Sequence, residues 1–181
     1  MSRFVRVAGT TLVAVSVTLY AFLGRWEGAS EYTAYADKLA GGLPTVCRGL
    51  TKHVTDTPII VGQKWSKEKC ETEEVRAIER VQKSLANCFK LPPPQSVFDA
   101  ASSHAWNFGY PSTCTSGAMA AWNIGDWTTG CRRIYQNDAG RPAWSFVKTG
   151  RVIDGKAEYK FVQGLANRRF AEYEYCMRDV K

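Results

Sequence analysis

The chain has 181 residues, a length that suits one globular domain with some appended sequence. Hydrophobic residues make up 45% of it and charged residues 23%, which excludes a disordered tail and predicts a buried core. The formal net charge of +7 suits a polyanionic partner such as a membrane surface or an acidic cell-wall polymer, and the lack of a run of basic residues argues against a nucleic-acid partner.

The first predicted element is hydrophobic. Residues 7–23 contain no charge and follow Arg3 and Arg6, so a helix of this length just crosses a hydrocarbon core with the arginines on the cytoplasmic side. A cleaved signal peptide is an alternative, but the residues before the possible cuts fit poorly, and we predict an uncleaved signal anchor over residues 1–24. A permanent anchor and a buried core helix remain open. The run is diluted by small and polar residues, which favour its exit from the bilayer: Gly9, Thr10, Thr11, Ser16 and Thr18.

A small β region is predicted next. Residues 28–62 are rich in glycine, threonine and β-branched residues, and we expect strands at TAYAD and LPTVCRGLT with AGG as the turn between them. A helix begins after Ser66, a capping residue. Its apolar residues recur at helical spacing: Val75, Ile78, Val81, Leu85 and Cys88.

The rest of the chain is predicted to be mainly helical. LPPPQ at 91–95 breaks the chain, a second helix follows to about Trp106, and Gly109 ends it. Shorter helices are expected at TSGAMAAWNIG and DWTTGCRRIYQND, the stretch that starts at Ala143 is mixed, and GLANRRFAEYEYCMRD closes the chain as a helix. The fold class is therefore α+β, with a small N-terminal β region and a mainly helical lobe.

The cysteines indicate disulfides rather than a metal site. They are six in number and include no C-x-x-C pair, and the two histidines, His53 and His104, lie far apart. We expect no metal and three disulfides in an oxidising compartment, with free cysteines in a cytosolic protein as the alternative. The cysteines are Cys47, Cys70, Cys88, Cys114, Cys131 and Cys176.

Two acids and a threonine are the candidate catalytic residues. Glu27 and Asp37 lie ten positions apart, a pairing that occurs by chance in most proteins, so the simplest interpretation gives them roles in a helix end and a turn. Thr45, which follows Pro44 across a glycine-rich loop, makes the set more specific.

In this order the residues resemble the phage-type lysozymes, glycoside hydrolase family 24. The family signature runs from a glutamate-glycine at the end of the first helix, through an aromatic-x-aspartate, to a G-x-P-T strand, and the matching stretches here are WEG, YAD and GLPT. AWNFG at 105–109 and GLANRR at 164–169 are similar to other parts of the family sequence. The resemblance implies a lysozyme-like catalytic domain over residues 25–181 and a muramidase that cuts the β-1,4 bond between N-acetylmuramic acid and N-acetylglucosamine in peptidoglycan.

The resemblance also implies a role for each candidate residue. Glu27 is the general acid, Asp37 the second carboxylate and Thr45 the residue that helps hold the attacking water, with no cofactor. Both spacings within this set are longer than is usual in the family, so we expect the extra residues in loops, and Cys47 stands where the family often has glycine. A lytic transglycosylase, and a membrane-anchored wall-binding module without catalysis, are the alternatives.

A six-cysteine subset of these lysozymes looks like this chain. That resemblance implies the disulfides Cys47–Cys70, Cys114–Cys131 and Cys88–Cys176. In the family the catalytic glutamate ends the first helix of the folded enzyme, and here that helix can only come from the hydrophobic segment.

The chain therefore resembles the signal-arrest-release endolysins. We expect a single-pass protein of the host inner membrane, inserted by the Sec translocon, with its catalytic domain in the periplasm. While the segment spans the membrane, Glu27 cannot reach Asp37 and Thr45. Release into the periplasm, when a holin collapses the membrane potential, is expected to produce an active monomer.

Overall fold

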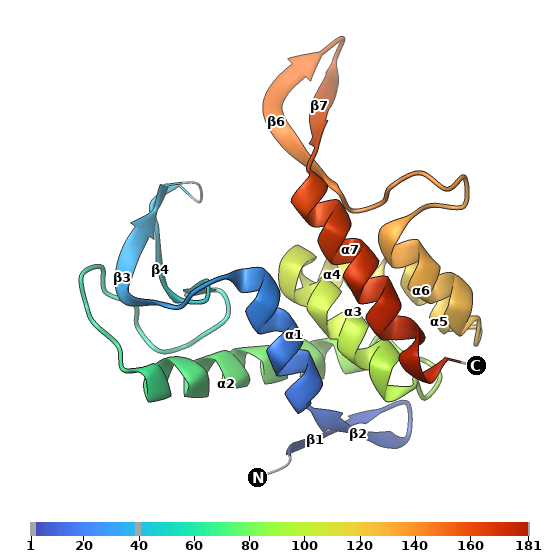
Figure 1. Cartoon of the computed structure of the whole chain (residues 1–181), viewed down its shortest axis with the longest axis horizontal. Coiled ribbons are helices and arrows are strands. Elements are labelled where there is room, and N and C mark those ends of the chain that lie inside the picture. The colour runs from blue at the N-terminus through green and yellow to red at the C-terminus, as the bar shows by residue number, and fades with distance from the viewer. Residues whose placement is uncertain (1–2, 39–40, 181) are drawn as a thin grey trace.

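Figure 1 shows the computed structural model of the chain, in which residues 3–38 and 41–180 are described. Helices form one lobe, and small antiparallel sheets lie at its edges. The elements are β1 (Arg3–Val7), β2 (Thr10–Ala14), α1 (Val17–Glu27), β3 (Glu31–Asp37), β4 (Leu43–Cys47), β5 (Leu50–Thr51), α2 (Lys67–Ala86), α3 (Gln95–Phe108), α4 (Tyr110–Cys114), α5 (Gly117–Trp122), α6 (Trp127–Tyr135), β6 (Phe146–Ile153), β7 (Lys156–Phe161), α7 (Gln163–Cys176) and a 3-10 turn at Met177–Asp179. The predicted α+β class, with a small β region and a helical lobe, is confirmed.

The helical lobe is built around α3. This helix is buried along nearly its whole length, because small residues let its neighbours approach closely on several sides. α2, α7 and α1 all pack against it. The largest core is made of residues from α2, α3, α5, α6 and α7, including Leu85, Phe98, Met119, Ile134 and Tyr175.

The β region forms where the sequence predicts it, but the stretch LPTVCRGLT, expected as one strand, is divided into β4 and β5. β3, β4 and β5 make an antiparallel sheet in that order. Ala34, Val46 and Leu50 turn inward against Trp65 and form a second, smaller core. The disulfide between Cys47 at the end of β4 and Cys70 in α2 then fastens this sheet to the helical lobe.

The N-terminal segment departs from the prediction. Residues 7–23 do not form one hydrophobic helix: β1 and β2 make a hairpin that turns at Ala8 and Gly9, both with positive φ, and only α1 is helical. Over the described ranges 3–38 and 41–180, no helix combines the length and the apolar character needed to cross a bilayer. The expected signal-anchor helix is therefore absent from this fold.

Side-chain packing explains the split. Val5, Val7 and Ala14 face inward from the hairpin and join the main core, and β1 lies against α2. Ser16 then caps α1, with its Oγ accepting a hydrogen bond from Leu19 N at 3.0 Å. A count of apolar residues detects the length of the segment, but it does not distinguish a helix from a β-branched hairpin that buries one face.

Two of the three predicted disulfides are wrong. The structure has Cys47–Cys70 as expected, but it joins Cys88 to Cys114 and Cys131 to Cys176. The pairing follows the helix packing, because Cys88 lies two residues after the end of α2 and Cys114 ends α4, and these two helices are in contact. Cys131 and Cys176 lie on α6 and α7, which also pack together. The pairs Cys114–Cys131 and Cys88–Cys176 would cross between these helix pairs.

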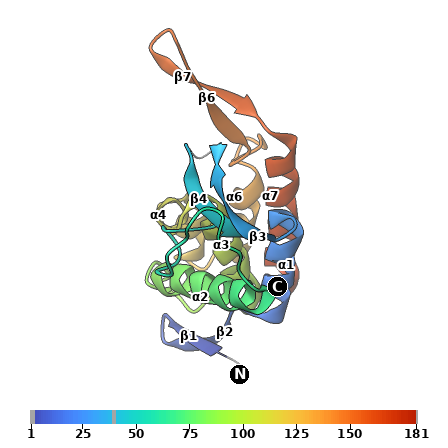
Figure 2. The ribbon, with the colours of Figure 1, turned by 90° about the vertical axis from the view of Figure 1, so that its left-hand side faces the viewer.

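The stretch that the sequence left mixed is a β-hairpin. β6 and β7 pair in antiparallel fashion around a turn at Asp154 and Gly155, both with positive φ. In both views the hairpin projects to the same side of the molecule as the β3–β4 sheet (Figures 1 and 2). At its base, β7 leads directly into α7.

Candidate active site

Glu27 lies where a helix ends. It is the last residue of α1, and Gly28 follows with a φ of +77°, a backbone conformation that residues other than glycine rarely adopt. The glycine of the WEG motif therefore lets the chain leave α1 and enter β3. This placement agrees with the expectation that the hydrophobic segment supplies the helix that ends at Glu27.

Arg168 holds the Glu27 carboxylate. Its Nη1 donates to Glu27 Oε1 at 2.7 Å, and the side chain of Arg168 is 5% exposed whereas that of Glu27 is 22% exposed. The contact joins residues 141 positions apart in the chain. Sequence reasoning noted GLANRR as a family stretch but gave Arg168 no role, because only the fold brings α7 to the end of α1.

Behind this pair lies a buried charged cluster. Glu172 Oε1 accepts hydrogen bonds from Arg168 Nε at 3.3 Å, from Arg169 Nη2 at 2.5 Å and from Ser103 Oγ at 2.6 Å. The positive charges of Arg168 and Arg169 are thus balanced by the negative charges of Glu172 and Glu27, in a region from which water is largely excluded. The cluster fixes Arg168, and Arg168 in turn orients Glu27.

His104 packs beside this cluster. Its ring is fully buried in α3, with Nδ1 2.8 Å from Thr113 Oγ1, and it lies perpendicular to the Trp144 ring with 4.6 Å between the ring centres. Burial lowers the pKa of His104 well below its usual value of 6.5, and the positive charges of Arg169 and Arg168 lower it further.

This lowered pKa predicts a loss of stability in acid. Below about pH 6.5 the unfolded chain binds a proton at His104 that the folded protein does not, so the free energy of unfolding falls as the pH falls, by about 1.4 kcal/mol per pH unit. We expect wild type to lose about 2 kcal/mol more than His104→Gln between pH 7.5 and 5.0. Urea unfolding at several pH values measures this difference. Parallel stability curves for the two proteins would contradict the assignment of a neutral His104.

Asp37 and Thr45 lie on neighbouring strands. Asp37 ends β3 opposite Leu43, and Thr45 lies opposite Tyr35 in the same ladder. Because directly opposed residues share a face and Tyr35 and Asp37 are two positions apart, Asp37 and Thr45 are diagonal neighbours on one face of the sheet. The longer spacing between them is taken up by the β3–β4 connection, as expected, although residues 39 and 40 lie outside the described part of the chain.

The contacts of these two residues differ. Thr45 is buried, and its hydroxyl donates to Leu43 O at 3.0 Å. Asp37 is half-buried, and its carbonyl oxygen accepts from Gly42 N at 2.7 Å. Cys47 has a φ of +57°, a conformation that glycine adopts without strain, and its disulfide with Cys70 ties this position to α2.

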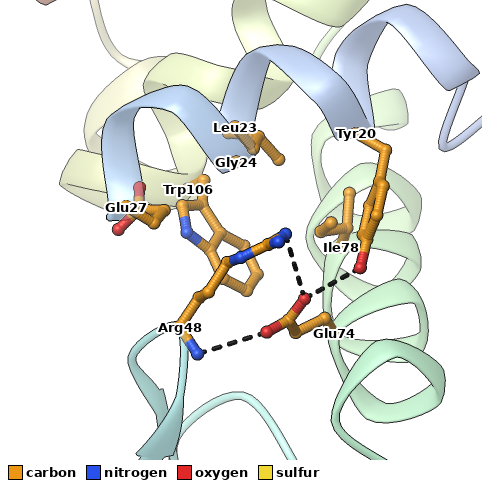
Figure 3. Close-up of a pocket in the computed structure, with 8 residues that line it drawn as sticks. All are labelled: Tyr20, Leu23, Gly24, Glu27, Arg48, Glu74, Ile78 and Trp106. Carbon is orange, nitrogen blue, oxygen red and sulfur yellow. Dashed lines mark hydrogen bonds and ion pairs between the residues drawn. The ribbon is translucent and has the colours of Figure 1, made fainter. Parts of the chain in front are cut away.

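A pocket extends from Glu27 along α1. Figure 3 shows Glu27 at one end and Tyr20 at the other, with Arg48 and Glu74 between them. Trp106 of α3 forms part of the wall. Among the residues that the structure describes, no cluster of three or more histidine, cysteine, aspartate or glutamate side chains is arranged to hold a metal ion.

Comparisons with known proteins identify relatives of the chain. The sequence is 30% identical over 169 residues to the SAR-endolysin of Pseudomonas phage phiKMV, a match that covers 93% of this chain and 89% of that protein. It is 39% identical over 127 residues to the SAR-endolysin of Escherichia phage 933W, covering 66% and 67% of the two chains.

Solved structures share the fold. The endolysin from Escherichia coli O157:H7 phage FAHEc1 superposes with a TM-score of 0.72 at 24% identity, over 92% of this chain and 94% of that one. A mutant of P22 lysozyme superposes with a TM-score of 0.65 at 19% identity, over 90% and 97% of the two chains. The fold is therefore lysozyme-like. The sequence model of the phage lysozyme family matches residues 24–172, which include Glu27, Asp37, Thr45 and Arg168, and the chain belongs to this family.

Proposed function

We propose that this chain is a phage endolysin, a muramidase that hydrolyses the β-1,4 bond between N-acetylmuramic acid and N-acetylglucosamine and so lyses the host cell. The observation that carries the proposal is the position of Glu27, held by Arg168 at the end of α1, directly before the sheet that bears Asp37 and Thr45. Membership of the phage lysozyme family supports it, as do relatives named endolysins.

Glu27 is the general acid in this mechanism. Cleavage of a glycosidic bond needs a proton on the leaving oxygen while positive charge develops on the sugar ring. The side chain of Glu27 is 22% exposed, so a bound glycan can reach its carboxyl group. Arg168 restrains its orientation toward that oxygen.

Asp37 and Thr45 act on the attacking water. The Thr45 hydroxyl already donates its proton to Leu43 O, so its oxygen is left to accept a hydrogen bond from water. Asp37, on the same face of the sheet, orients the water as the second carboxylate and stabilises the cation-like transition state. The net charge of +7 attracts the enzyme to the anionic wall.

Analysis of the products tests the reaction. The purified full chain is incubated with Gram-negative peptidoglycan, and the released sugars are identified by mass spectrometry. Reducing muramic acid ends are expected for a muramidase. Anhydro ends would identify a lytic transglycosylase instead, and binding without any release would identify a wall-binding module.

We further propose that residues 1–24 are a signal anchor and residues 25–181 the catalytic domain. The Sec translocon inserts residues 7–23 into the inner membrane as a helix, which satisfies its backbone in lipid, and the catalytic domain lies in the periplasm. The uncharged run after Arg3 and Arg6, and relatives named SAR-endolysins, support this arrangement. A holin that collapses the membrane potential then triggers release.

After release, the segment forms hydrogen bonds with side chains of the catalytic domain. Ser16 Oγ donates to the buried Asp99 at 2.6 Å, and Tyr175 OH donates to the same carboxylate oxygen at 2.9 Å. Thr18 Oγ1 lies 2.6 Å from Tyr175 OH. Ser16 and Thr18, two of the polar residues that weaken the anchor in lipid, therefore bond to the folded domain, and both effects favour the released form.

A further inference from the structure

A buried carboxylate in α2 accepts hydrogen bonds from α1, which carries Glu27, and from the residue that follows β4, which carries Thr45. Glu74 is 4% exposed and accepts a hydrogen bond from Tyr20 OH at 2.9 Å. It also accepts from the backbone N of Arg48 at 3.2 Å and from Arg48 Nη1 at 3.5 Å. Figure 3 shows these three side chains meeting in the pocket, with dashed lines from Glu74 to Tyr20 and to Arg48.

The two partners lead to different catalytic residues. Tyr20 lies on α1 seven positions before Glu27, two helical turns along the same face. Arg48 lies directly after β4, three positions after Thr45. Glu74, which lies in α2, therefore links α1, the helix that ends at Glu27, to β4, the strand that carries Thr45.

The fit between α1 and Arg48 is close. A Cβ atom on Gly24 would lie 3.3 Å from Arg48 Nη1, so the glycine lets the guanidinium pack against α1. The Arg48 guanidinium also lies 5.7 Å from the centre of the Tyr20 ring. Burial and the charge of Glu74 raise the pKa of Tyr20 to about 12, so its hydroxyl keeps the proton that it donates.

We propose that Glu74 is a positioning residue that sets Glu27 against Asp37 and Thr45 by holding Tyr20 and Arg48 at fixed places. The inference rests on the proposed function, since it concerns the geometry of hydrolysis. A reacting group displaced by about 1 Å costs up to about 100-fold in rate, and Glu74 is one of several restraints on α1.

Glu74→Gln is the first test, because it keeps the shape and removes the charge. We expect kcat on peptidoglycan to fall about tenfold with KM within about twofold, since Glu74 is buried and glutamine keeps its shape. The measurement is the initial rate of new reducing ends over a range of substrate concentrations, with thermal unfolding of the same samples.

Glu73→Gln is the matched control. Glu73 is the neighbouring buried glutamate of α2 and also accepts from one hydroxyl and one arginine, Thr55 Oγ1 and Arg76 Nη1, each at 2.7 Å. Its partners lie in the loop after β5 and on α2 itself. We expect a comparable fall in melting temperature with kcat unchanged. Equal kcat in the two variants would overturn the proposal and leave Glu74 a purely structural residue.

Tyr20→Phe keeps the test decisive if Glu74→Gln does not fold. It removes one hydroxyl, and we expect kcat to fall threefold or more. An unchanged kcat in folded Tyr20→Phe would contradict the proposal. Where Glu74→Gln folds, the double variant should lose no more than Glu74→Gln alone, because both changes break the same link. Additive losses would contradict that link. A wild-type protein that releases no sugars would refute the proposed function itself, whatever the variants do.

Discussion

Replacing Glu27 by glutamine should lower the release of reducing ends from peptidoglycan by at least about 1,000-fold. Glutamine fills the same space and still meets Arg168, but it has no proton to give to the leaving oxygen. The buried cluster of Arg168, Arg169 and Glu172 stays intact behind it, so the fold should survive. The rate of new reducing ends, measured with purified protein and divided by the concentration of folded protein, gives the ratio.

Glu31→Gln is the control for this change. Glu31 is an exposed glutamate four positions later, at the start of β3, and its loss should leave the rate within about twofold of wild type. Thermal unfolding and sedimentation with insoluble peptidoglycan show whether each variant still folds and binds. An activity of Glu27→Gln within tenfold of wild type, in a folded protein, would remove Glu27 from the role of general acid.

Features set by a few adjacent residues were predictable from the sequence. Ser66 accepts from Lys69 N at 3.1 Å and starts α2 where the capping pattern places it. Gly28 ends α1 directly after Glu27, because the chain needs a positive φ there. The β3–β4 hairpin follows from strand-forming residues on either side of a glycine turn. In each case the cause and the element lie within one or two turns of chain.

Features that depend on residues far apart in the chain were not predictable from the sequence. The ion pair of Glu27 with Arg168 spans 141 positions, and the disulfides other than Cys47–Cys70 depend on which helices pack together. The β6–β7 hairpin had a local sequence signal that was missed: Asp154-Gly155 is typical of a two-residue β-hairpin loop. Its mostly exposed strands lack the alternation of a buried sheet face, and this hid it.

The N-terminal segment shows why hydropathy alone was insufficient. Ser16 and the residues before it form hydrogen bonds with groups 67 to 83 positions away: Val15 N donates to Gln82 Oε1, and Val13 N to Gln95 Oε1, each at 2.9 Å. None of these partners exists in a lipid bilayer. The same residues therefore favour a helix in lipid and a hairpin with a shorter helix on the folded domain.

This difference allows the proposed release to be tested without damage to the enzyme. Ser16 and Thr18 are unsuitable targets, because leucine there would remove the cap of α1 and the bonds to Asp99 and Tyr175. Thr11 and Ala21 are exposed in the folded protein. Leucine at both positions makes the segment more apolar in lipid and leaves the folded contacts in place.

Thr11→Leu combined with Ala21→Leu should hold the protein in the membrane. Ala21→Leu alone adds three carbons to the anchor, worth about 2 kcal/mol in hydrocarbon, and the pair should favour the bilayer by at least about 3 kcal/mol, or over 100-fold. We expect the double variant to remain in the membrane fraction and to delay or abolish lysis of the host. The full chain refolded with its disulfides in the absence of lipid should hydrolyse peptidoglycan within about twofold of wild type.

Glutamine at the same two positions separates hydrophobicity from size. It is nearly as large as leucine but polar, so Thr11→Gln with Ala21→Gln should release at least as readily as wild type and lyse the host no later. Cell fractionation and lysis timing compare the pairs directly. If the leucine pair lyses the host as fast as the glutamine pair, the hydrophobicity of residues 7–23 does not control activity, and the anchor proposal fails while the muramidase proposal stands. If only the leucine pair is retained, the weakness of the anchor is itself the feature that allows Glu27 to reach Asp37 and Thr45.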